Sequence, residues 1–429
     1  MNVVRTNNTK DKVRELQIKL YLTAKASKTR RFHALYDKIY RMDILEKAWK
    51  NVKVNKGSAG IDEVTIKEIE EIGIDNILKE IQEELKIKSY RSKPVLRVEI
   101  PKSNGKMRPL GVPTVKDRII QASTKIVIEP IFEANFKECS YGFRPKRNQH
   151  MALETIRKAC NNKGIWVLDA DIKGCFDNIN HEKLMKLIER RISDRRMLKL
   201  INKWLKAGIM KDGIIEANEI GSPQGGVISP LLSNIYLNYM DTLWEKHFSH
   251  LGKLVRFADD FVIVCKNYKS VKHARRAIEE IMRRLELTFS EEKTKTVSLW
   301  EGKDGFDFLG FHNRMIKHKN NRGYEYYQLV QWLSDKAKKR IQETVRNFLR
   351  RSTYKFNLKD MIKGINRKII GWQNYYGISR YDKLIQIDKY IIMRFIMWFN
   401  GKRQTYKRRG YYEIAKMING MGLKRLAIR

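Results

Sequence analysis

Carboxylates interrupt two strongly apolar segments of this 429-residue chain, and this feature constrains its fold more than any other. Trp166–Asp171 is a short apolar run that ends in an acid, and Val255–Cys265 is a longer run with Asp259 and Asp260 near its middle. The two runs predict buried strands: a single strand in the first segment, and two strands joined by a tight acidic turn in the second. An unpaired charge is costly in such a setting, so these carboxylates need a partner.

A divalent cation is the partner that suits clustered carboxylates. Mg²⁺ is a hard ion that takes a few carboxylates together with substrate phosphates. Two such ions about 3.5–4 Å apart activate an attacking hydroxyl and stabilise a leaving oxygen in an in-line displacement, which is the chemistry of nucleotide addition to a 3′ end. An isolated Asp-Asp pair is more often a solvated turn. The apolar flanks of Asp171, Asp259 and Asp260 favour the catalytic interpretation.

The charge balance indicates a polyanionic partner. Lys and Arg number 88 against 48 Asp and Glu, which gives a formal net charge of +40. Phosphate neutralisation by such a surface releases condensed counterions and drives nucleic-acid binding. A ribosome-like structural binder would have a similar composition. A membrane partner is not expected, because the chain has no run of about 18 apolar residues and its N-terminus has no signal-peptide core. The expected location is a bacterial cytoplasm, near the nucleoid, or an organelle interior.

The remaining pattern predicts helices around these strands. Residues 10–53 form an expected helical segment with two apolar stripes, followed by a loop at 55–62 and a helix-rich segment to Lys88. Residues 95–100 and a second strand after 103–106 form an expected β-hairpin that carries basic side chains. The polar stretch 318–323 is interpreted as the boundary to a second unit, basic and helical from about Gln328. Further helices are expected at 116–135, 182–206, 230–247, 271–287, 334–351, 358–376 and 381–399.

Six ordered motifs resemble those of the reverse transcriptases encoded by group II introns. Phe257–Asp260 resembles the Y/F-x-D-D box, Asp169–His181 resembles the first palm motif, and Gly221–Leu232 is similar to the P-Q-G box. Three further blocks appear in the expected order: Arg108–Pro113, Ser140–Pro145 and Phe308–Phe311. The similarity covers nearly the whole chain, from about Leu20 onward. Phe257 stands where the commoner box has Tyr, which removes a hydroxyl but no metal ligand, so activity is expected to survive.

The resemblance implies an α+β fold of the right-hand polymerase type. Mixed α/β fingers and palm, with an antiparallel palm sheet, would be followed by an α-helical thumb. The implied division is an N-terminal helical extension with a template/primer loop (1–88), fingers and palm (89–312) and a helical thumb or maturase domain (313–429). The implied reaction is RNA-directed DNA synthesis with two Mg²⁺ ions, for which Mn²⁺ could substitute. The implied partners are an RNA template, a DNA or RNA primer, dNTPs and the parent group II intron RNA; the oligomeric state stays open.

Matched motif by motif, the resemblance implies roles for individual residues. The implied catalytic residues are Asp171, Asp259 and Asp260, and the implied metal ligands are Asp171, Ile172 and Asp259. The implied nucleotide-binding residues are Lys102, Arg108, Phe176, Gln224, Gly225 and Lys293. Among these, Phe176 would be a bulky gate against a ribose 2′-OH and Lys293 a proton donor to pyrophosphate. The implied primer and template contacts are Asn55, Gly57, Gly60, Phe143, Arg144, Leu309 and Gly310, and the implied RNA-binding residues of the thumb are Lys336, Lys339, Arg340, Lys402 and Arg403.

Several of these residues also have a plainer interpretation. Phe176 could be a core side chain on a turn, and the two Phe rings of Phe308–Phe311 could be core as well. Lys102 and Lys293 could be solvated surface in a chain with 88 basic residues. Most aromatic residues of the C-terminal unit are expected to form the core of a helical bundle.

Two other functions fit a polymerase-like fold. A splicing factor without enzymatic activity would bind RNA, but it would have no use for the clustered carboxylates. A host-recruited reverse transcriptase that serves defence or repair would differ only in its genomic context. Longer family members carry a DNA-binding segment and a His-Asn-His endonuclease with Cys pairs. This sequence has no such pairs, so cleavage of target DNA is not expected.

Overall fold

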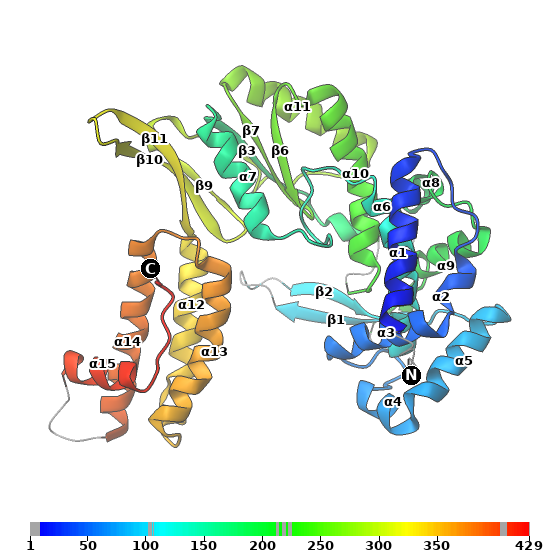
Figure 1. Ribbon diagram of the computed structural model, residues 1–429, viewed down its shortest axis with the longest axis horizontal. Coiled ribbons are helices and arrows are strands. Elements are labelled where there is room, and N and C mark those ends of the chain that lie inside the picture. Colours follow the sequence, from blue (N-terminus) through cyan, green and yellow to red (C-terminus); the bar gives the residue numbers. More distant parts are fainter. Residues whose placement is uncertain are drawn as a thin grey trace, which may run out of the picture. The chain divides into compact units, whose positions relative to one another are not determined.

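A computed structural model describes residues 9–101, 105, 107–211, 214–216, 220–221, 225–403 and 410–428 (Figure 1). The chain folds into two compact units: unit 1 comprises residues 1–152 and 168–295, and unit 2 comprises residues 153–167 and 296–429. The stretch 318–323 is the end of strand β10 (Phe311–Lys319) and the turn to β11 (Glu325–Leu333), so its interpretation as a boundary is wrong. Asn and Gly make a hairpin turn as readily as a linker. The division at 312/313 likewise falls inside β10.

The helices at the start of unit 1 pack on one long helix. α1 (Thr9–Ala26), α2 (Tyr36–Ile39) and α3 (Met42–Val54) contact α6 (Val115–Glu133), and α4 (Ile66–Ile72) and α5 (Ile74–Lys86) follow α3. The helical prediction for 10–53 is confirmed apart from breaks at 27–35 and 40–41. Tertiary contacts stabilise the non-helical segment 27–35. At its end the Asp194 carboxylate accepts hydrogen bonds from the backbone N–H groups of Leu35 and Tyr36, both at 2.9 Å.

Two four-stranded sheets each combine strands that are far apart in the sequence. The predicted hairpin is present as β1 (Val95–Pro101) and β2 (Met107–Val112), which β4 (Ile209–Lys211) and β5 (Ile214–Glu216) extend in the order β2-β1-β4-β5. The second sheet has the order β6-β7-β3-β8, with β6 (Gly252–Phe257), β7 (Asp260–Cys265), β3 (Trp166–Asp171) and β8 (Lys295–Ser298). β3 and β7 are the inner strands, which explains why their sequences are the most apolar.

The other helices of this part of the chain lie between these strands in sequence. They are α7 (Gln149–Asn161), the short η1 (Cys175–Asn178), α8 (His181–Glu189), α9 (Arg195–Leu205), α10 (Ser229–Leu243), η2 (Trp244–Phe248) and α11 (Tyr268–Arg284), which packs on β6 and β7. The single helix predicted at 182–206 is two helices. Asp194 caps the N-terminus of α9 by accepting hydrogen bonds from the N–H groups of Arg196 and Met197, which fixes the break.

Unit 2 combines a small sheet with a helical bundle. β9 (Gly305–Phe308), β10 and β11 form an antiparallel sheet after η3 (Trp300–Gly302), so the prediction that the segment is helical from Gln328 is wrong for Gln328–Leu333. The predicted helices after that point are confirmed as α12 (Asp335–Phe348), α13 (Leu358–Tyr376) and α14 (Tyr381–Arg403), with η4 (Arg351–Thr353) and α15 (Tyr411–Gly420) in addition. Figure 1 shows α12, α13 and α14 side by side, and Ile341, Ile365 and Phe395 lie in their shared core.

No helix within the described ranges is long and apolar enough to cross a membrane.

Candidate active site

The acidic turn is the tip of the hairpin formed by β6 and β7. Phe257 pairs with Asp260, so only Ala258 and Asp259 lie between the two strands. Ala258 has a φ of 60°, as the turns of two-residue hairpins require. β7 lies directly beside β3 in the sheet. The two acid-bearing strands are therefore neighbours, although 88 residues of sequence separate Asp171 from Asp259.

Backbone hydrogen bonds join the ends of these strands. The N–H of Ile172 donates to the carbonyl of Asp259 at 3.4 Å, and the N–H of Ser290 donates to the carbonyl of Asp171 at 2.8 Å. Ile172 itself is buried, directly after β3. The sheet thus fixes both carboxylates on rigid elements, as an acidic site needs.

The carboxylates raise one another's proton affinity. Burial raises the pKa of Asp259, and the charge of Asp171 raises it further. Burial, followed by the charges of Asp171, Asp169 and Asp259, raises the pKa of Asp260 to about 7. The cluster therefore carries more negative charge than its surroundings stabilise, and it favours a cation.

Two basic residues face this cluster. Lys293 Nζ donates to Asp171 Oδ2 at 2.6 Å, and this hydrogen bond raises the pKa of Lys293. The charge of Arg108, on β2, lowers the pKa of Asp259. In the part of the chain that the structure describes, no group of three or more His, Cys, Asp or Glu residues is placed to hold a metal ion. Lys102 and Gln224, two of the predicted nucleotide-binding residues, lie outside the described residues.

A wholly buried arginine, Arg256, is hydrogen-bonded to the backbone of the acidic turn. Arg256 on β6 pairs with Asp241 on α10, with Nε 2.9 Å from Oδ1, and its guanidinium also donates to Asn234 Oδ1 at 3.0 Å and Ser140 Oγ at 2.8 Å. A further bond, of 2.9 Å, reaches the carbonyl of Ala258 in the turn itself. Arg256 therefore connects the backbone next to Asp259 to two other segments, α10 and the loop that contains Ser140.

The block Ser140–Pro145 lies against the same turn. The N–H of Tyr141 donates to the Arg256 carbonyl at 2.9 Å. Gly142 packs so closely on Ala258 that a Cβ would overlap the backbone of that residue. Arg144 is buried and paired with Glu133 at 2.6 Å, whereas Phe143 is 53% exposed. Of the two predicted template contacts, Phe143 is accessible to a ligand and Arg144 is engaged within the protein.

The predicted gate lies in the short helix η1, which Gly221, the first residue of the P-Q-G box, contacts. Phe176 is in η1 and 8% exposed. Gly221, with a φ of 95°, lies against η1, and a Cβ there would be 2.7 Å from the carbonyl oxygen of Asp177. Gly225 lies against β2, where a Cβ would be 2.6 Å from the Gly111 carbonyl oxygen. These two glycines allow the close backbone approach on which the segment depends.

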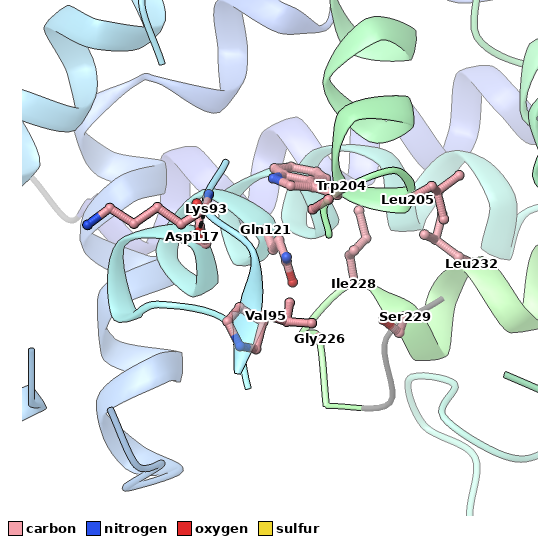
Figure 2. A pocket seen from close by; sticks show the side chains of 12 residues that line it. Lys93, Val95, Asp117, Gln121, Trp204, Leu205, Gly226, Ile228, Ser229 and Leu232 are labelled. Carbon is pink, nitrogen blue, oxygen red and sulfur yellow. Dashed lines mark hydrogen bonds between the residues drawn. The ribbon is translucent and has the colours of Figure 1, made fainter. Parts of the chain in front are cut away.

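Gln121 holds the segment that follows Gly225. Its Oε1 accepts a hydrogen bond from the N–H of Val227 at 2.9 Å, and the side chain is buried. Figure 2 shows Gln121 reaching from α6 toward Gly226, close to Ile228 and Ser229. Sequence reasoning missed Gln121 and Arg256. A charge inside the apolar run Leu254–Phe257 was a signal for Arg256, but nothing in the sequence identified its partners.

The other predicted contacts lie in separate places. In unit 1, the loop with Asn55, Gly57 and Gly60 docks on the start of α6, where Arg118 donates to the Ser58 carbonyl. In unit 2, Leu309 and Gly310 form the turn between β9 and β10, and the Tyr375 hydroxyl donates to the Leu309 carbonyl at 3.1 Å. The flanking Phe308 and Phe311 rings are core.

The predicted RNA-binding cations of unit 2 are on its surface. Lys336, Lys339 and Arg340 are exposed on α12. Lys402 is exposed near the end of α14, with Nζ 5.3 Å from the centre of the buried Trp398 ring. The side chain of Arg403 lies outside the described part.

Comparison with known proteins identifies the class. Residues 100–313 match the family described as reverse transcriptase (RNA-dependent DNA polymerase), and residues 338–415 match the group II intron, maturase-specific domain. The fold and its acidic site thus belong to a reverse transcriptase joined to a maturase domain. Protein YkfC of Escherichia coli is 35% identical over 351 residues, which cover 72% of this chain and 90% of that protein.

A second relative is the group II intron-encoded protein LtrA of Lactococcus lactis. It is 43% identical over 213 residues, which cover 49% of this chain and 35% of LtrA. An uncharacterised 91 kDa protein of a cob intron in Schizosaccharomyces pombe is 36% identical over 226 residues, 51% of this chain and 27% of that protein. The chain belongs to the group II intron-encoded reverse transcriptase/maturase family. It spans about a third of the length of LtrA.

Proposed function

We propose that this protein copies RNA into DNA by adding deoxynucleotides to a primer 3′-OH, and that unit 2 binds the parent intron RNA and assists its splicing. The observation that carries the first part is the meeting of Asp171, Asp259 and Asp260 at the ends of neighbouring strands β3 and β7. In this proposal unit 1 supplies the fingers and palm, and α12–α15 supply the thumb. The proposed location is a bacterial cytoplasm or an organelle.

The chemistry of these donors supports two Mg²⁺ ions as the cofactor in this proposal. Hard carboxylate oxygens are the ligands that Mg²⁺ prefers, and substrate phosphates complete its coordination. The raised pKa of Asp260 indicates that the cluster has too little positive charge around it. The hydrogen bond from the Lys293 ammonium to Asp171 shows that the cluster attracts a cation. Asp171 and Asp259 would hold the metals, with the Ile172 carbonyl as a further candidate ligand. When bound, the ions would supply activation of the 3′-OH and charge stabilisation at the leaving oxygen.

The protein's own groups handle the triphosphate. The charge of Arg108 lowers the pKa of Asp259. Its guanidinium can bind phosphate oxygens in a bidentate manner. Lys293, whose ammonium donates a hydrogen bond to Asp171, would donate a proton to departing pyrophosphate in this proposal. Gly225 lets the backbone approach β2, the strand that carries Arg108. Each of these groups acts by position and charge, as phosphoryl transfer requires.

Primer extension tests the proposal. The purified protein, an RNA template, an annealed DNA primer and dNTPs should give full-length cDNA with Mg²⁺ and none with excess chelator. A matched assay would follow intron splicing in vitro with and without protein. A folded, RNA-binding protein that extends no primer under any metal would overturn the polymerase and leave an RNA-binding splicing factor.

Phe176→Ala is expected to relax the choice of sugar. The ring sits on the buried turn beside the P-Q-G segment, where its bulk would meet a 2′-OH. Removing a steric barrier of this kind changes discrimination by roughly 1–3 kcal/mol, or about 10- to 200-fold. The measurement is the ratio of kcat/KM for dNTP and rNTP, with Tyr268→Ala as a control that removes an exposed ring on α11. An unchanged ratio with lower stability would assign Phe176 to the core alone.

Gln121→Leu is expected to raise KM for dNTP more than it lowers kcat. Leucine leaves the Val227 N–H without an acceptor, a loss of about 1–3 kcal/mol that loosens the segment bearing Gln224. Gln121→Glu keeps an acceptor oxygen and should retain most of the wild-type KM. Steady-state kinetics on a fixed primer–template checks this, and an equal fall in kcat with unchanged KM would contradict it.

A further inference from the structure

Five basic side chains line one cavity of unit 1, which has a volume of about 180 Å³. None of the described residues that line it is acidic. Like charges gathered around a cavity repel one another, so the arrangement costs free energy unless an anion binds there. The lining residues are Lys88, Arg91, Arg196, Lys199, Lys203, Tyr36, Tyr90 and Leu200.

The sequence of α9 places three of these cations in one row. Arg196, Lys199 and Lys203 are separated by three and four residues, the spacing of neighbours along one side of a helix. The other side of α9 is buried, with Ile201 and Trp204 in the core. The amphipathic helix therefore holds the basic row rigidly at the cavity.

The chain that leaves α5 contributes the other two cations. The N–H of Lys88 donates to the Leu85 carbonyl at 3.3 Å, and the N–H of Ser89 donates to the Glu84 carbonyl at 3.0 Å, which turns the chain toward Arg91. Lys88 has a φ of 62°. This left-handed conformation costs a non-glycine residue roughly 1–2 kcal/mol. The turn thus keeps a cation at a position where glycine would be more stable.

Carboxylates compensate little of this charge. Arg196 Nε lies 3.5 Å from Asp194 Oδ1, and its guanidinium lies 5.5 Å from the centre of the Tyr36 ring. Within the described ranges, Lys88, Lys199 and Lys203 form no ion pair. Burial, followed by the charges of Arg91 and Lys199, lowers the pKa of Lys203. The lysines therefore act on one another, while Asp194 pairs with Arg196.

We propose that this cavity binds a phosphate group of an RNA backbone, through residues other than those of the acidic cluster. Sites for whole small molecules have volumes of about 300–1,000 Å³, so this smaller cavity suits one anionic group. Lys and Arg contacts to phosphate position a strand without reading its bases. The net charge of +40 makes a polyanion the favoured carrier of that phosphate. The site would bind RNA independently of its base sequence and separately from the acidic cluster.

A charge-matched pair of variants tests the site. Lys199→Gln/Lys203→Gln removes two lysines from α9, and Lys269→Gln/Lys272→Gln removes two exposed lysines from α11. Binding of a fluorescein-labelled oligouridylate is followed by anisotropy across a salt series. The α9 variant should bind on the order of tenfold more weakly at 0.1 M salt, with a log–log salt slope smaller by about 1.4. The α11 variant should keep the wild-type slope. Equal slopes for the two variants would overturn the proposal.

Lys88→Gly separates binding from folding. It removes one cation and relieves the left-handed strain, so RNA binding should weaken while the thermal midpoint stays or rises. Lysine acetylation read by mass spectrometry gives a local readout: the RNA should protect Lys199 and Lys203 and leave Lys269 and Lys272 reactive. Protection by inorganic phosphate alone, with none by the RNA, would assign the cavity to a free anion and overturn the backbone assignment. None of these measurements depends on polymerase activity.

Discussion

Replacing Asp259 by Asn is expected to abolish primer extension without unfolding the protein. The amide keeps the shape of the side chain but loses the charge that would hold Mg²⁺. The loss of several kcal/mol of transition-state stabilisation corresponds to about 10³-fold or more in rate. Since burial and the charge of Asp171 both raise the pKa of Asp259, the neutral amide also removes a repulsion. The free energy of unfolding should therefore stay equal or rise.

Single-turnover extension and chemical denaturation together check this result. Asp169→Asn is the matched control, because Asp169 lies two residues before Asp171 on the same strand and its charge also acts on Asp260. If the cluster needs ligands at defined positions, the control retains most of its activity. Equal losses in the two variants would show that the site depends on total charge alone, and the metal assignment would fall.

Replacing Arg256 by Ala is expected to cost about 3–5 kcal/mol of unfolding free energy. The guanidinium is wholly buried and bonded to Asp241, Asn234, Ser140 and the Ala258 carbonyl. Removing it leaves the Asp241 carboxylate buried without its counter-charge. It also frees the turn that carries Asp259, so activity should fall together with stability.

Urea denaturation monitored by tryptophan fluorescence measures the effect. Arg256→Met/Asp241→Leu, which removes both charges, should recover a large part of the lost stability. Arg283→Ala is the surface control: Arg283 pairs with Glu280 at 2.9 Å, with a side chain that is 76% exposed, and its loss should change little. A loss below about 1 kcal/mol for Arg256→Ala would mean that solvent reaches the pair.

Local patterns were sufficient to predict most elements. The apolar run of 166–171 predicted β3, the strand pattern on either side of 103–106 predicted the β1–β2 hairpin, and helix periodicity predicted α13 over its observed range. These predictions succeed because the burial of one face of an element, and the residues that make a turn, are determined by a few neighbouring residues. The six motifs predicted roles for individual residues, which hydrophobic periodicity alone does not indicate.

Long-range partners were beyond such reasoning. The carboxylate of Asp194 ends the helical pattern near Leu35, 159 residues away in sequence. The strand β10 has buried residues in its first half, Phe311, Asn313 and Met315, and exposed lysines at its end, Lys317 and Lys319, so the composition of that end resembles a linker. Gln121 is a polar residue inside an apolar helix, and only the fold shows that it accepts the N–H of Val227. In each case the determining contact is made by a residue that could not be located from the sequence.

The path of the chain through unit 2 has a consequence for synthesis on the ribosome. Residues 153–167 belong to this unit, and their partners come much later: the Asn161 side chain accepts the N–H of Leu329, and the Gln331 side chain donates to the Leu153 carbonyl. The nascent chain must therefore carry residues 153–167 without these partners until more than 160 further residues have been made. A fragment that starts at residue 296 would lack the same contacts. Unit 2 can therefore be completed only late in translation, and separate expression of either half would leave hydrogen-bonding groups exposed.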